Sequence, residues 1–91
     1  MKIQPHNTSG IWIKKSILQN EKLNSDEKLV YAVIDYFIGN GIANYTWVYN
    51  ETISDMVGIP EPDIEPIIVS LEKKEIIRIG IDEVKKNRII W

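Results

Sequence analysis

A single apolar stripe between residues 25 and 38 constrains the fold more than any other feature of the chain. Apolar side chains recur there at three- and four-residue spacing, the pattern of a helix that covers a core with one face. The residues of the stripe are Leu29, Val30, Val33, Ile34, Phe37 and Ile38. Asn24 can cap the first amides while Glu27 reaches back to it, and Gly39-Asn40-Gly41 supplies a stop. The sequence therefore predicts an amphipathic helix over residues 25–38.

Two shorter helices are predicted further along the chain. Asn50 can cap a helix over residues 51–57, and Gly58 follows as its end. After a proline-rich break, apolar residues at helical spacing predict a third helix. An interior proline costs about 3 kcal/mol, so this helix is expected to begin late, with Asp63 as its cap and Pro66 in its first turn.

The end of the chain predicts a β-hairpin. Isoleucines alternate along residues 76–81, and residues 88–91 can return after a turn at 82–87. With a short strand expected at 45–49, the order of elements is that of a winged helix-turn-helix domain. This is an α+β, mainly α fold of three helices plus a C-terminal β-hairpin wing. The shared core is expected to contain Ile53, Val57, Ile64, Ile68 and Leu71.

Composition adds limits on the class of protein. Residues 1–10 have little apolar content and are predicted to form a mobile arm, which leaves residues 11–91 as a single domain. The chain has no cysteine, its one histidine, His6, lies in that arm, and it has neither a phosphate loop nor a serine elbow. No apolar run approaches the roughly 20 residues that span a bilayer. We therefore expect a cytoplasmic protein that is not an enzyme, with no membrane, metal or cofactor.

Several short segments carry a family resemblance. LNSDEKLVY at 23–31, WVYNETI at 47–53, VGI at 57–59 and LEKKEII at 71–77 resemble winged helix-turn-helix domains of phage and plasmid replication initiators. The amino-terminal domain of DnaD-like replisome organisers is the particular group. The resemblance covers roughly residues 11–91 and lies mostly at core and cap positions, which specify fold better than function. It implies DNA binding in transcription or replication control, with the third helix in the major groove and often a dimer.

The charges favour a particular way of holding double-stranded DNA. The third helix carries Glu61, Asp63 and Glu65 where a DNA reader usually offers cations, so contact is expected through the wing and the basic termini instead. The residues predicted to contact DNA are Lys85, Lys86, Asn87, Arg88, Lys14 and Lys15. Arg88 can also enter a minor groove. The alternative is that these charges keep an exposed hairpin and surface soluble.

The acidic third helix supports a second hypothesis. Glu61, Asp63 and Glu65 can present a negative patch to a basic protein, so the domain would be a protein-interaction module, such as a phage or plasmid effector or inhibitor. Helix capping and solvation is the simpler explanation of the same carboxylates. Both hypotheses, DNA binding and protein docking, remain open at the level of sequence.

The aromatic residues divide into two groups. Tyr45, Trp47 and Tyr49 flank the helix-turn-helix and are predicted to complete its core rather than to stack on bases or form an interface. Trp12 and Trp91 lie on the terminal elements, where an aromatic side chain can be buried between two subunits. A homodimer through these terminal elements is therefore a further expectation.

Overall fold

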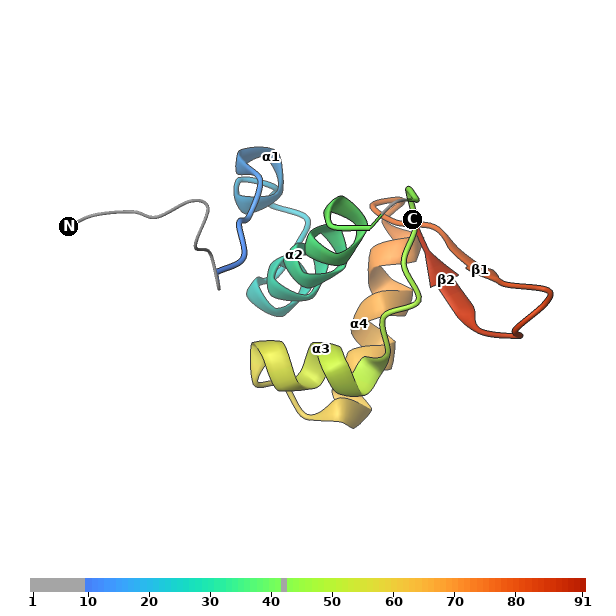
Figure 1. Cartoon of the computed structure of the whole chain (residues 1–91). Coiled ribbons are helices and arrows are strands. Elements are labelled where there is room, and N and C mark those ends of the chain that lie inside the picture. The colour runs from blue at the N-terminus through green and yellow to red at the C-terminus, as the bar shows by residue number, and fades with distance from the viewer. Residues whose placement is uncertain (1–9, 42) are drawn as a thin grey trace.

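The computed structural model describes residues 10–41 and 43–91 (Figure 1). Within them the chain forms a small, mainly helical α+β domain with four helices and an antiparallel two-stranded hairpin. The elements are α1 (Lys15–Leu18), α2 (Ser25–Gly39), α3 (Asn50–Val57), α4 (Glu61–Lys73), β1 (Ile79–Ile81) and β2 (Arg88–Ile90). The arm predicted over residues 1–10, with His6, lies outside the described residues except for Gly10. No described helix has the length and apolarity that a bilayer crossing needs.

Helix α2 forms where its apolar stripe and cap predict it. The Asn24 Oδ1 atom accepts a hydrogen bond from the Glu27 amide, and a Glu27 carboxylate oxygen accepts one from the Asn24 amide, both at 2.8 Å. The predicted capping box is therefore confirmed, and the helix extends one residue further than predicted, to Gly39. Val30, Val33 and Ile34 are fully buried, whereas Leu29 at the edge of the stripe is 40% exposed.

Helices α2, α3 and α4 pack together around the core (Figure 1). Four of the five predicted core residues, Ile53, Ile64, Ile68 and Leu71, have no exposed surface, and Val57 is half-buried against them. Gly58 ends α3 in the left-handed region at φ 76°, which glycine adopts without a steric penalty. The predicted core and this helix end are thus confirmed.

Helix α4 begins earlier than predicted. It starts at Glu61, with Pro60 in the cap position and no side-chain cap, so the prediction of Asp63 as cap is wrong. Pro62 costs little there because first-turn amides lack intrahelical partners anyway. Pro66 lies inside the helix, where it removes a backbone bond, but both prolines are exposed and water can solvate the freed carbonyl. Burial of the apolar face of α4 outweighs the local cost.

The hairpin pairs Ile79 with Ile90 and Ile81 with Arg88, as an antiparallel ladder. It extends from the helical body on the side away from α1 (Figure 1). The fully buried Ile90 fixes its base, where the Ile90 and Thr46 backbones exchange two hydrogen bonds of 2.9 Å. The strand predicted over 45–49 is reduced to this single bridge. Its position nevertheless attaches the hairpin to the segment between α2 and α3.

Candidate functional site

A groove of the described surface lies where the amino ends of α3 and α4 meet the hairpin. It has a volume of about 310 Å³. Three segments far apart in the sequence contribute to it: the residues before and at the start of α3, the first residue of α4, and the start of β2. The lining residues are Trp47, Val48, Tyr49, Asn50, Glu51, Glu61 and Arg88. We call this the α3–α4 groove.

Aromatic side chains form the outer wall of the α3–α4 groove. The prediction that these aromatics complete the core is wrong: Trp47 is 38% exposed and Tyr49 63% exposed, while Thr46 and Val48 are buried. The cause is the backbone bridge at Thr46, which turns the even-numbered residues inward and leaves their neighbours outside. Tyr45, half-buried, packs edge-to-face on Trp47 with 5.3 Å between ring centroids.

Asn50 and Arg88 connect the walls of the groove. One guanidinium nitrogen of Arg88, Nη1, lies 3.0 Å from Glu65 Oε1, and the other, Nη2, donates to the Val48 carbonyl at 2.9 Å. The same Glu65 oxygen accepts a 2.9 Å bond from Asn50 Nδ2. Asn50 therefore does not cap α3 as predicted; it is the first residue of the helix, and Tyr49 is in the cap position without a side-chain bond.

This arrangement gives Arg88 contacts within the protein. Its side chain is only 22% exposed, and its guanidinium is held by two internal acceptors. A phosphate would have to compete with both. Arg88 thus links the hairpin to α4 inside the protein, and its contact with DNA stays a prediction.

Two carboxylates of the groove have no such partner. Glu51, in the first turn of α3, and Glu61, the first residue of α4, are both exposed, and no ion pair involves them within residues 10–41 and 43–91. Of the predicted acidic patch, Glu61 lines the groove, Glu65 adjoins it through Arg88, and Asp63 is exposed outside its lining. Sequence analysis did not assign Glu51 to the patch, because nothing local shows that the starts of α3 and α4 meet.

The turn between β1 and β2 is held by hydrogen bonds to the Asp82 side chain. The Asp82 carboxylate accepts bonds from the Val84 amide at 2.8 Å and the Lys85 amide at 3.1 Å. These bonds, that of Lys85 first, lower the pKa of Asp82 below its ordinary value. The Lys85 ammonium lies 5.1 Å from the centroid of the Trp47 ring, in a cation–π contact. Lys86 is exposed at φ 63°, a conformation that non-glycine residues rarely adopt.

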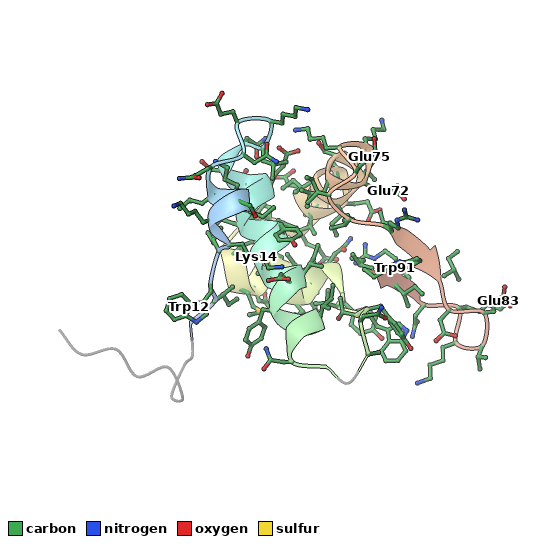
Figure 2. The ribbon with its side chains drawn as sticks, turned by 90° about the horizontal axis from the view of Figure 1, so that it is seen from above. Trp12, Lys14, Glu72, Glu75, Glu83 and Trp91 are labelled. Atoms are coloured by element: carbon green, nitrogen blue, oxygen red, sulfur yellow. The ribbon has the colours of Figure 1, made fainter. Side chains whose placement is uncertain are left out.

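The predicted DNA-contacting residues do not gather on one face. Lys14 pairs with Asp35 at 3.3 Å, and its pKa is raised first by Tyr31 and then by Asp35. It lies with the exposed Lys15 at the α1 end of the molecule, whereas Lys85, Lys86 and the half-buried Asn87 belong to the hairpin turn. Figures 1 and 2 place these two regions at opposite ends.

The two terminal tryptophans are also apart. Trp12 is 68% exposed near α1, and Trp91 is 43% exposed beside the hairpin (Figure 2). Trp91 packs so closely on Gly80 that a Cβ atom there would lie 2.9 Å from its ring. A dimer through the terminal elements would therefore use the Trp12 surface of both subunits, the Trp91 surface of both, or the Trp12 surface of one against the Trp91 surface of the other.

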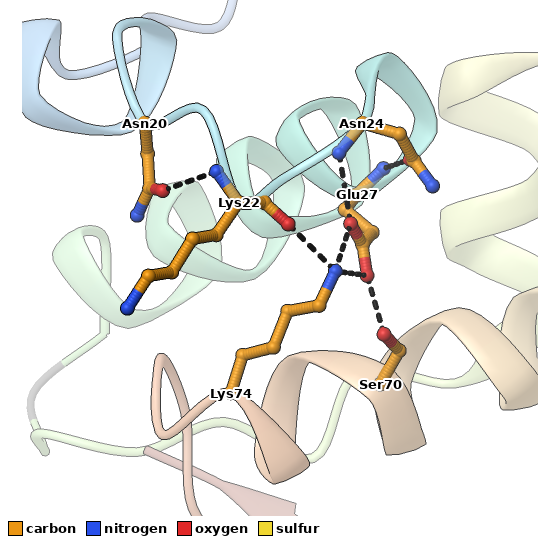
Figure 3. A network of polar contacts seen from close by, with 6 residues as sticks. All are labelled: Asn20, Lys22, Asn24, Glu27, Ser70 and Lys74. Carbon is orange, nitrogen blue, oxygen red and sulfur yellow. Dashed lines mark hydrogen bonds and ion pairs between the residues drawn. The ribbon is translucent and has the colours of Figure 1, made fainter.

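A second polar cluster joins α2 to the end of α4 (Figure 3). Glu27 is 2% exposed, and its carboxylate accepts bonds from Lys74 Nζ at 2.8 and 2.9 Å and from the Ser70 hydroxyl. Burial acts to raise the pKa of Glu27, but the bonds from Lys74, Ser70 and the Asn24 amide outweigh it and lower that pKa. Lys74 also donates to the Lys22 carbonyl at 2.7 Å. Because these groups satisfy one another, the cluster is structural and offers no ligand site.

Comparison with known proteins adds no relative: no family model, curated protein or solved structure matches the chain. In the part of the chain that the structure describes, no group of three or more His, Asp or Glu side chains is placed to hold a metal ion. The α3–α4 groove combines exposed aromatic rings, two carboxylates without an ion pair in the described residues, and one guanidinium bound within the protein.

Proposed function

We propose that the domain is a winged helix-turn-helix scaffold that acts as a protein-interaction module and docks a positively charged segment of a partner protein in the α3–α4 groove. The order α2, α3, α4, hairpin and the bridge from Thr46 to β2 support the scaffold. The observation that carries the function is the charge of the groove. Among the described residues, Glu51 and Glu61 form no ion pair there, while Arg88, the one cationic residue of the lining, is bound internally.

The position of the groove explains why DNA is disfavoured at α4. In winged-helix DNA readers the corresponding helix enters the major groove. Here the first turn of α4 carries Glu61 and Asp63, which would face phosphates, and Pro62 has no amide to donate to one. Aromatic side chains are enriched at surfaces that bind proteins. The carboxylates beside them would complement the charge of a basic partner.

Weak, nonspecific DNA binding in transcription or replication control is the second candidate. It is favoured by Lys85 and Lys86 at the tip of the hairpin, where a wing approaches the phosphate backbone. Lys85 would have to leave the Trp47 ring to make such a contact. This mode leaves the carboxylates of the groove without a role.

Charge reversals distinguish the two candidates. We expect a short fluorescent peptide rich in basic residues to bind the wild-type protein, and Glu51→Lys combined with Glu61→Lys to abolish binding. The matched control is Glu72→Lys with Glu75→Lys, which makes the same change of charge at the carboxyl end of α4, the end opposite Glu61. Figure 2 labels both residues. The control should retain most of the affinity, because exposed charges more than about 10 Å apart are largely screened at 0.1 M salt.

Fluorescence anisotropy measures binding of the peptide. The same measurement with a fluorescent random-sequence DNA duplex, repeated at several salt concentrations, tests the DNA candidate. Each neutralised phosphate contributes about 0.9 to the slope of log affinity against log salt. We expect no binding. A slope of several units that disappears when Lys85 and Lys86 are both changed to Glu, together with no peptide binding, would overturn the docking proposal in favour of the wing.

A further inference from the structure

We propose that the α3–α4 groove selects arginine: a guanidinium of the partner stacks on the Tyr49 ring and pairs with Glu51 and Glu61. This inference rests on the proposed function and specifies the side chain that the groove recognises. Tyr49 and both carboxylates line the same groove and come from the starts of two adjacent helices.

The protein's own Arg88 provides the first support. Its guanidinium already lies against the groove, with one nitrogen on the Glu65 carboxylate and the other on the Val48 carbonyl. The planar fork of arginine suits a pair of acceptors set side by side. Glu51 and Glu61 give the groove two further acceptor groups, and neither forms an ion pair with a cation of residues 10–41 or 43–91.

Tyr49 provides the second support. It is 63% exposed, and its backbone is fixed as the residue before α3, where its carbonyl accepts the Ile53 amide at 3.1 Å. Trp47, two residues earlier on the same side of the segment, already has the Lys85 ammonium over its ring at 5.1 Å. Tyr49 has no such cation in the described residues, so its ring is the aromatic face that remains for a partner.

Arginine fits this site better than lysine for physical reasons. A guanidinium is planar, stacks on an aromatic ring, and is more weakly hydrated than an ammonium, so it loses less solvation on entering the groove. It can also bond to two carboxylates at once through separate nitrogens. Lysine offers a compact charge that can contact the carboxylates but not stack in the same way.

The test uses three peptides that differ at one kind of position: arginine, lysine, or citrulline, which is the uncharged analogue of arginine. We expect the arginine peptide to bind the wild-type protein several-fold more tightly than the lysine peptide, and the citrulline peptide not to bind. Because an exposed cation–π contact is a modest interaction, Tyr49→Leu should weaken the arginine peptide about two- to fivefold. Tyr49→Phe keeps the ring and should bind like wild type. Trp12→Leu removes an exposed aromatic that does not line the groove and should change nothing.

The outcomes separate this inference from the proposed function. Equal affinity for the arginine and lysine peptides, with no effect of Tyr49→Leu, would overturn arginine selectivity while the Glu51 and Glu61 reversals still supported docking. If neither the arginine peptide nor the lysine peptide binds the wild-type protein, both the arginine selectivity and the proposed docking function are overturned. The comparison of peptides on the wild-type protein needs no substitution, so its result does not depend on how the variants fold.

Discussion

Replacing Lys74 by methionine removes the ammonium that holds the buried Glu27 carboxylate and keeps most of the apolar stem. Glu27 would then retain the Ser70 and Asn24 bonds but would lose both contacts of 2.8 and 2.9 Å with the cation. Removing one member of a fully buried pair costs about 3–5 kcal/mol. The Lys74 side chain is 34% exposed, however, so water screens part of the interaction. We therefore expect a loss of about 2 kcal/mol, or a Tm lower by about 8–16 °C for a domain of this size.

Urea unfolding monitored by tryptophan fluorescence measures the change, with Lys73→Met as the control. Lys73 is the adjacent exposed lysine and has no ion-pair partner among the described residues. Because the folded pKa of Glu27 is lowered, its contribution in wild type is fully present above the ordinary value of 4.5 and is lost as the pH falls through the folded pKa. The free energies of unfolding of wild type and of Lys74→Met should therefore converge as the pH falls through the folded pKa of Glu27. An equal, small loss for both methionine variants at neutral pH would refute the role given to the Lys74 ammonium.

Substitutions at three further positions test other parts of the structure. Asn24→Ala removes the cap of α2 and should cost about 1 kcal/mol in urea unfolding, whereas Asn24→Asp should restore most of it. Gly80→Ala places a Cβ atom 2.9 Å from the Trp91 ring, so the ring must move; we expect about 1 kcal/mol of destabilisation and an altered near-ultraviolet circular dichroism spectrum. An unchanged spectrum would contradict that packing. Arg88→Met frees Glu65 and should tighten binding of the basic peptide while destabilising the fold by about 1–2 kcal/mol; weaker binding would mean that Arg88 itself contacts the partner.

The elements predicted well from the sequence are those that local signals define. The stripe of α2 is accompanied by a capping box at Asn24, and Gly58 has a backbone conformation that marks the end of α3. In each case the residues that set the boundary lie within a few positions of one another. The hairpin was also predictable, because alternating isoleucines flank a polar turn. Nearby residues are sufficient to predict an element's boundary where no contact with a distant residue shifts it.

The wrong predictions concern positions whose conformation depends on residues far away in the sequence. The bridge between Thr46 and Ile90 turns Trp47 and Tyr49 outward, and no pattern within residues 45–49 distinguishes that arrangement from its opposite. Helix α4 starts before the predicted cap because its apolar face is anchored in the core. The pairing of Arg88 with Glu65 joins residues of different elements and likewise has no signature in the sequence.

Different residues bear on the scaffold and on the function of the domain. The core residues Ile53, Ile64, Ile68 and Leu71 would pack equally well beneath a helix of either charge, since none of them reaches the surface. In the proposed function, the few exposed side chains at the starts of α3 and α4 determine the ligand. With cations there, the proposed winged-helix scaffold would attract phosphates; with Glu51 and Glu61 there, it would attract a cation instead. Reversing these two charges is therefore expected to change the partner while leaving the fold intact.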